Sequence, residues 1–199
     1  MKKPIAKLPV IICPGFHEAS LTEQFVQSVF PSSILPTGEL PPRELLLQHL
    51  RPLVVAAFCA DPLAVFDWMT QTLGSPEENP QPVVAIGFSG GVVGIAGALL
   101  LWQQQGGQVK KLIAIDGWGM PIVGLPVCRL SHDYFTHWSS LPLGAGKVNF
   151  YADPPVDHLQ MWRDPNRVSG QAASSWQRQN DLPVTASEFI RQMLSQPDI

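Results

Sequence analysis

Charge is scarce in this chain, and basic residues are fewer than acidic ones. Of 199 residues only 15% are charged, and 13 lysines and arginines against 16 acidic residues leave a formal net charge of -3. Proteins that bind nucleic acids or anionic membranes usually carry an excess of clustered basic residues. The composition therefore predicts no nucleic-acid partner.

Cysteine is also rare. The three cysteines, Cys13, Cys59 and Cys128, are odd in number and each lies in an apolar stretch. This pattern favours buried, reduced thiols over a disulfide framework, so a cytoplasmic location is expected. No signal peptide is expected either, because Lys7 and Pro9 interrupt the apolar run near the N-terminus.

A hydrophobic run long enough to cross a membrane is missing as well. Residues 83–102 are nearly uncharged and approach that length, but the turn GFSGG in their middle would break a spanning helix. We therefore expect no membrane span. With 45% hydrophobic residues, the chain is long enough for a single domain, residues 1–199, with a sizeable core.

Short apolar runs alternate with helical patterns along the chain. Strands are predicted at residues 8–13, 83–86, 111–116, 125–130 and 147–151. Helices are predicted over 43–50 and 92–102 and after three start signals, Ser20 with Glu23, Asp61 with Pro62, and Thr185 with Glu188. Residues 34–35 and 53–59 are further strand candidates, and the sequence leaves open which short run supplies the remaining strand. This alternation predicts an α/β fold, a three-layer sandwich with a mostly parallel central sheet. Sites in such sheets lie at the carboxyl ends of the strands.

The sequence Gly87-Phe88-Ser89-Gly90-Gly91 links a predicted strand to a predicted helix. A serine on so sharp a turn has strained backbone angles and tolerates only small neighbours. The turn would lift the Ser89 hydroxyl above the sheet edge and point the Gly90 amide out of the first helical turn, where an oxyanion is favoured. The five residues alone also fit a small-residue turn that packs a helix closely on a sheet. The buried strand before them favours a nucleophile, and so do Gly94 and Gly97, three apart in the helix after them, which would let one helix face approach the sheet closely.

A serine hydroxyl needs a base to remove its proton and a carboxylate to orient that base. The candidate bases are the five histidines, His17, His49, His132, His137 and His158. The candidate acids lie near predicted strand ends and are Asp116, Asp133, Asp153 and Asp157.

Together these features resemble the α/β-hydrolase family, over nearly the whole chain. That family places nucleophile, acid and histidine in this order on successive strand ends, which implies Ser89, Asp133 in RLSHD and His158 in VDHLQMW as catalytic residues. The sequence CPGF, residues 13–16, is similar to the loop that supplies the second oxyanion donor. The resemblance thus implies an oxyanion hole made by the amides of Phe16 and Gly90.

The resemblance also leaves a second position for the acid. Asp116 ends an earlier strand, and some members of the family take their acid from there. Asp133 is preferred, because an acid shortly before the histidine is the usual arrangement. Only about 32 residues, 117–148, separate the flanking strands, so the large cap of the family is absent and an open site is expected.

The candidate catalytic residues could also have other roles, either structural or in a different kind of site. Asp133 could cap the following helix, and His158 could be a partly buried structural histidine. A metal site built from His132, Asp133, His137 and His158 is chemically possible, but its spacing matches no zinc motif and we expect no metal. Cys13 has apolar surroundings that would not stabilise a thiolate nucleophile.

Large apolar side chains occur in the loops expected around the site. We predict that Trp118, Met120, Trp138 and Met161 line an apolar substrate pocket, although ordinary packing of loops on the core explains them equally well. The sequence thus predicts a cytoplasmic serine hydrolase that cleaves a carboxylic ester or thioester through an acyl-enzyme, without a cofactor. The alternative is a catalytically inactive binding or interaction module. The oligomeric state is left open.

Overall fold

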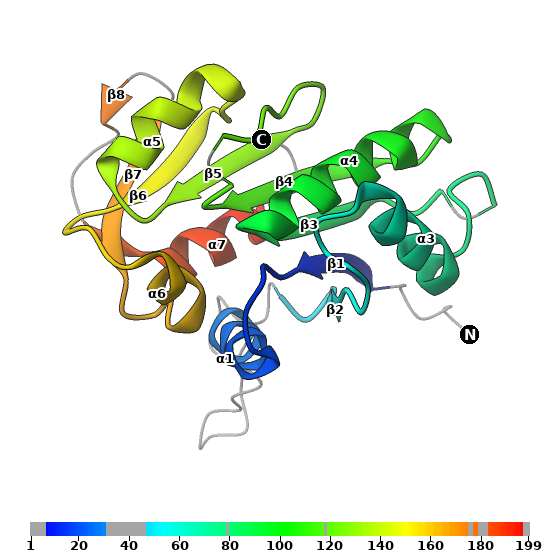
Figure 1. Ribbon diagram of the computed structural model, residues 1–199, viewed down its shortest axis with the longest axis horizontal. Coiled ribbons are helices and arrows are strands. Elements are labelled where there is room, and N and C mark those ends of the chain that lie inside the picture. Colours follow the sequence, from blue (N-terminus) through cyan, green and yellow to red (C-terminus); the bar gives the residue numbers. More distant parts are fainter. Residues whose placement is uncertain are drawn as a thin grey trace.

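The computed structural model describes residues 7–30, 47–78, 80–117, 119–174, 177–178 and 183–196. Within these ranges all strands belong to one sheet (Figure 1). The strands are β1 (Leu8–Cys13), β2 (Leu50–Val54), β3 (Val83–Phe88), β4 (Val109–Ile115), β5 (Val127–Ser131), β6 (Val148–Ala152), β7 (Ser169–Ser174), β8 (Gln177–Arg178) and β9 (Val184–Thr185). Their order is β2-β1-β3-β4-β5-β6-β7-β8, with β9 also paired to β7.

The sheet is mostly parallel. Strands β1 to β6 pair in parallel, and β7, β8 and β9 add antiparallel pairs at one side. The carboxyl ends of six neighbouring strands therefore lie along one edge. The chain order changes direction between β1 and β3, and ligand sites of open α/β sheets lie outside such a point.

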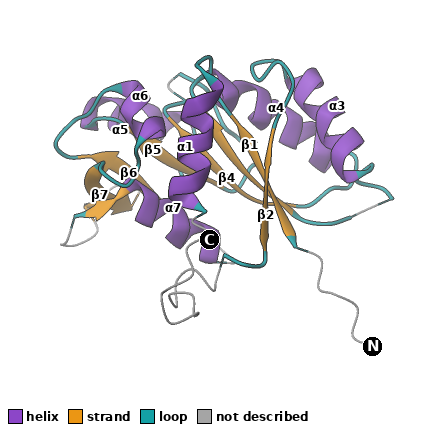
Figure 2. Ribbon diagram, turned by 90° about the horizontal axis from the view of Figure 1, so that it is seen from below, coloured by secondary structure: helices purple, strands orange, loops and turns teal. Residues whose placement is uncertain are grey.

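Helices cover both faces of the sheet. One face carries α1 (Ala19–Val29), α6 (His158–Arg163) and α7 (Ala186–Ser195) (Figures 1 and 2). The other face carries α3 (Pro62–Leu73), α4 (Gly90–Gln104) and α5 (Tyr134–Ser140). Helix α5 continues into the short 3-10 turn η1 (Leu141–Leu143). The fold is thus α/β with three layers, as the sequence predicts. No helix in the described ranges is both long and apolar enough to cross a membrane.

Two apolar cores flank the sheet, and β1 shows why. Val10 and Ile12 face the α1, α6 and α7 side, whereas Ile11 and Cys13 face the α3 and α4 side, and all four are fully buried. A strand covered by helices on both faces has no position for a polar side chain. Its sequence is therefore a continuous apolar run.

The predicted strands of the parallel part are confirmed, with ends shifted by a few residues. Residues 53–59 contain the end of β2, which begins at Leu50. Residues 47–49 form a turn where a helix over 43–50 was predicted. Residues 34–35 and 43–46 lie outside the described residues. The sequence missed β7, β8 and β9, since their small and polar residues show no strand-like alternation.

Two of the three predicted helix starts are confirmed. Asp61 caps α3 by accepting from the Leu63 amide at 2.9 Å, and Thr185 and Glu188 form a capping box at α7. The capping box of Ser20 and Glu23 is wrong, because α1 already begins at Ala19 and no side chain caps it. The buried side chains of Phe25 and Val29 determine which face of α1 packs against the core.

Candidate active site

Ser89 lies on a tight turn between β3 and α4, as the sequence predicts. Its backbone angles are φ 52° and ψ -124°, a conformation that costs about 1–3 kcal/mol for a residue with a side chain. A Cβ added to Gly91 would lie 2.3 Å from the Cys13 carbonyl oxygen, and one added to Gly87 would lie 2.8 Å from Ile95. The flanking glycines therefore let α4 begin directly against β1 and β3, which holds Ser89 at the sheet edge.

Asp116 follows β4 and is the second strained residue. In the described ranges, Ser89 and Asp116 are the non-glycine residues with positive φ, and Asp116 has φ 49°. Its side chain is only 1% exposed. A buried carboxylate in a strained turn needs partners that compensate for its lost hydration.

Two histidines are those partners. His158, the first residue of α6, brings Nδ1 within 2.9 Å of Asp116 Oδ2, and His132, just after β5, brings Nδ1 within 3.1 Å of the same oxygen. The backbone amide of His132 donates to Asp116 Oδ1 at 2.9 Å. Both carboxylate oxygens are thus satisfied.

These contacts change the proton affinities. Burial alone would raise the pKa of Asp116, but hydrogen bonds from His132 and His158 bring that pKa below its ordinary value. The hydrogen bond to Asp116 raises the pKa of His132, against the opposing effect of partial burial. Asp116 is therefore a carboxylate at neutral pH, and the protonated form of His132 is stabilised relative to that of a free imidazole.

The prediction that Asp133 orients His158 is wrong in this geometry. Asp133 caps α5, where its Oδ1 accepts from the Thr136 amide at 2.6 Å, and its Oδ2 lies 3.6 Å from His132 Nε2. The carboxylate that contacts His158 is Asp116, the alternative acid of the sequence analysis. Both aspartates follow strand ends, and Asp116 is favoured because its carboxylate contacts His158; its strand β4 also lies directly beside β3, the strand that precedes Ser89.

A hollow of about 340 Å³ joins these residues. Its lining consists of Ser89, Gly90, Val93, Asp116, His132, Thr136 and His158. Within the described ranges no hydrogen bond links Ser89 to either histidine. In sites without substrate, the contact between nucleophile and base is often longer than a hydrogen bond and shortens in the substrate complex. The hollow thus brings together the predicted nucleophile and the predicted base.

Two predicted oxyanion donors lie beside Ser89. Gly90 is the first residue of α4, so its amide has no acceptor one turn earlier in the helix. The Phe16 ring lies over it, since a Cβ on Gly90 would be 2.9 Å from Phe16 Cε2. Across the described part of the chain, the amides of Phe16 and Gly90 donate to no protein acceptor, whereas the Ser89 amide donates to the Ile115 carbonyl at 2.9 Å.

Of the predicted substrate-binding residues, Met120, Trp138 and Met161 do not line this hollow. Met161 lies on α6 and is fully buried in the core, so its assignment to a pocket is wrong. Met120 packs against the core on the α4 side, and its carbonyl accepts from Arg129. Trp138 is 51% exposed on α5. Trp118 lies outside the described residues.

Exposed apolar side chains instead stand on the segments that follow the strands. Phe16 contacts Phe58 at 5.4 Å between ring centroids, and Phe135 contacts Trp138 at 5.8 Å. Val93, at the edge of the hollow, is 38% exposed. Most residues that line the hollow have polar side chains, although more of its exposed lining surface is apolar than polar. Aromatic groups surround the strand ends rather than forming a closed pocket. Sequence patterns could not show this, because periodicity does not distinguish a packed loop residue from an exposed one.

Asp116, His132 and His158 could in principle offer donor atoms to a metal, since one atom of each lies within 4.8 Å of the others. Their Nδ1 to Oδ2 distances of 2.9 and 3.1 Å are those of hydrogen bonds. These bonds account for the cluster, and we assign no metal to it. His137, a member of the metal set weighed in the sequence, is buried on α5 against Tyr151.

The remaining histidine and cysteine candidates lie away from the hollow. His17 packs against Phe88 and Trp162, and His49 is exposed in the turn before β2. Cys13 is fully buried, and its hydrogen-bonding interaction with Cys59 raises the pKa of the Cys13 thiol. All three cysteines are free and buried, as predicted.

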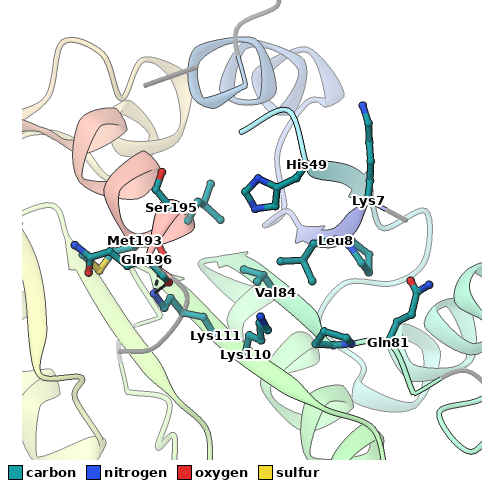
Figure 3. Close-up of a pocket in the computed structure, with 13 residues that line it drawn as sticks. Lys7, Leu8, His49, Gln81, Val84, Lys110, Lys111, Met193, Ser195 and Gln196 are labelled. Carbon is teal, nitrogen blue, oxygen red and sulfur yellow. Dashed lines mark hydrogen bonds between the residues drawn. The ribbon is translucent and has the colours of Figure 1, made fainter. Parts of the chain in front are cut away.

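A larger hollow of about 520 Å³ lies at the opposite, amino edge of the sheet (Figure 3). Here the buried Lys111 donates through Nζ to the carbonyl oxygens of Met193 at 2.6 Å and Gln196 at 3.0 Å. The lysine thereby binds the carboxyl end of α7, where a cation is favoured. The residues around this hollow include neither Ser89 nor its partners, so we place the candidate active site in the smaller one.

In comparisons with known proteins, no family model and no curated protein matches the chain.

Proposed function

We propose that the protein is a serine hydrolase of the α/β-hydrolase type, with Ser89 as nucleophile, His158 as base and Asp116 as the acid that orients the base. The substrate we propose is a carboxylic ester or thioester. One observation carries the proposal most: backbone strain falls on Ser89 and Asp116, and both line one hollow with His158. Such strain tends to concentrate at functional sites.

The hydrogen-bond pattern suits His158 to the role of base. Its Nδ1 faces Asp116, so the neutral ring carries its proton on Nδ1 and keeps the Nε2 lone pair free. Ser89 Oγ would pass its proton to Nε2 as it attacks the substrate carbonyl carbon. The carboxylate then stabilises the imidazolium that forms.

The tetrahedral oxyanion would be bound by the amides of Phe16 and Gly90. Both are free of protein acceptors in the described ranges, and Gly90 begins a helix of fifteen residues. Collapse of this intermediate transfers the proton from His158 to the leaving group and leaves Ser89 acylated. Water, activated by the same histidine, would release the acid and restore the serine.

The surroundings favour an apolar acyl or aromatic group over a sugar or a phosphate. Phe16 is 67% and Phe58 62% exposed beside the start of α4. The ionisable side chains in the hollow are those of Asp116, His132 and His158, and no arginine or lysine of the described ranges lines it. An ester with an uncharged, apolar acyl group can therefore bind in the hollow without leaving a charge of the protein unpaired.

The competing proposal is a fold of this type that binds a partner without catalysis. A fluorophosphonate separates the two, because it reacts rapidly only with an activated serine. We expect the wild type to label and Ser89→Ala to remain unlabelled. Asp116→Asn should label about 10²–10⁴ times more slowly, since the imidazole loses the charge that orients it.

Asp133→Asn is the matched control. It makes the same change on a neighbouring strand end, and asparagine still caps α5. We expect its labelling rate to stay within a few-fold of the wild type. A large loss in Asp133→Asn together with normal labelling in Asp116→Asn would return the acid to Asp133, and a folded wild type that does not label would favour the binding module.

A further inference from the structure

The carboxylate of Asp116 serves two histidines, of which the proposed mechanism uses one. Its Oδ2 accepts from His158 Nδ1 at 2.9 Å and from His132 Nδ1 at 3.1 Å. The His132 amide also donates to Oδ1 at 2.9 Å. His132 thus contacts both oxygens of the acid and has no role in the proton transfer itself.

His132 also faces a second carboxylate. Its Nε2 lies 3.6 Å from Asp133 Oδ2, so both ring nitrogens face acidic oxygens. A neutral imidazole has one N–H, whereas the imidazolium has two. The further ionisable groups around it are Asp157, which precedes α6, and His158, whose ring centroid is 6.0 Å away. The raised pKa of His132 agrees with this surrounding of acids.

We propose that His132 is a positioning residue of this site: it fixes the Asp116 carboxylate from two directions and, as an imidazolium sharing the same oxygen, disfavours a second positive charge on His158. The role of His132 in catalysis rests on the proposed function. The interaction between the two histidines can be measured whether or not the protein is an enzyme. Two positive charges about 6 Å apart in a partly exposed site repel by an amount equal to about half to one pKa unit. His132 would thereby keep His158 neutral, and able to act as a base, at a lower pH.

The test is a proton NMR titration of the histidine rings in wild type and His132→Gln. Glutamine can still donate to Asp116 but carries no charge. We expect the pKa of His158 to rise by about half to one unit in His132→Gln. His49→Gln, the same change at an exposed histidine on the opposite edge, should leave it unchanged. His132→Asn repeats the experiment if the glutamine variant does not fold.

A pKa of His158 that stays constant or falls in both His132 variants overturns the inference. Fluorophosphonate labelling supplies the second readout: below pH 6 the His132 variant should label about 3–10 times more slowly than the wild type, and the two rates should converge at high pH. If the wild type does not label at all, the proposed function fails while the titration still decides the coupling. If it labels but the pKa does not move, the coupling fails alone.

Discussion

Backbone strain marks the two residues on which the chemistry is proposed to depend. Ser89 and Asp116 have φ of 52° and 49°, where a side chain is disfavoured. The strain at Ser89 is held by α4, whose first turn packs against Cys13 and Pro14. Glycine would adopt the same angles without strain. Serine at this position therefore lowers the stability of the fold, which is expected where the side chain has a function.

Ser89→Gly should therefore be more stable than Ser89→Ala, by about 1 kcal/mol in the free energy of unfolding, because glycine relieves the strain that alanine retains. Urea denaturation measures this difference. At Ser139, inside α5, the order should reverse, since alanine is the better helix former. Equal stability of the two variants at position 89 would mean that the turn carries no strain.

Close packing between elements explains the glycines of α4. A Cβ on Gly94 would lie 1.9 Å from the Cys59 carbonyl oxygen, and one on Gly97 would lie 2.6 Å from the Pro62 ring. The sequence predicts that these two glycines let one face of the helix approach the sheet closely, and this prediction is wrong. The partner is the start of α3 and the loop before it, rather than the sheet. The spacing of glycines reveals a flat helix face but not what it contacts.

Gly94→Ala tests this contact. Alanine favours a helix over glycine by about 1 kcal/mol, yet the clash with backbone should lower the free energy of unfolding by about 1–3 kcal/mol overall. Leu100→Ala, at a partly exposed position of the same helix, should change it by less than about 1 kcal/mol. Stabilisation by Gly94→Ala in urea denaturation would show that α3 and α4 are not so closely packed.

Lys111 makes a comparable contact between β4 and α7. Lys111→Met should lower the free energy of unfolding by about 1–3 kcal/mol, because the carbonyls of Met193 and Gln196 lose their buried donor. Lys110→Met changes the exposed neighbour in the same strand and should have little effect. Thermal unfolding of the two variants under identical conditions distinguishes them, and equal midpoints would contradict the contact.

For the whole molecule, the parallel sheet explains how residues distant in sequence meet. Ser89, Asp116, His132 and His158 follow the carboxyl ends of β3, β4, β5 and β6, which are neighbours in the sheet. The basic Lys111 and the larger hollow lie at the other end. One edge thus holds the candidate chemistry, and the opposite edge has a structural contact.

Much of this arrangement could be predicted from the sequence. The apolar runs of β1 and β3 predict buried strands, and GFSGG places Ser89 between strand and helix. The choice between Asp116 and Asp133 could not be predicted, because both follow strands and only the sheet order and side-chain directions separate them. Met161 was misplaced for a similar reason, since an apolar residue beside a predicted site residue can equally face the core.

The most direct test of the central claim is peptide mapping of the wild-type protein after reaction with a fluorophosphonate. If Ser89 is an activated nucleophile, one adduct per chain should form, and it should lie on the peptide that contains Gly87 to Gly91. An adduct on another residue, or none in folded protein, would contradict the proposed active site.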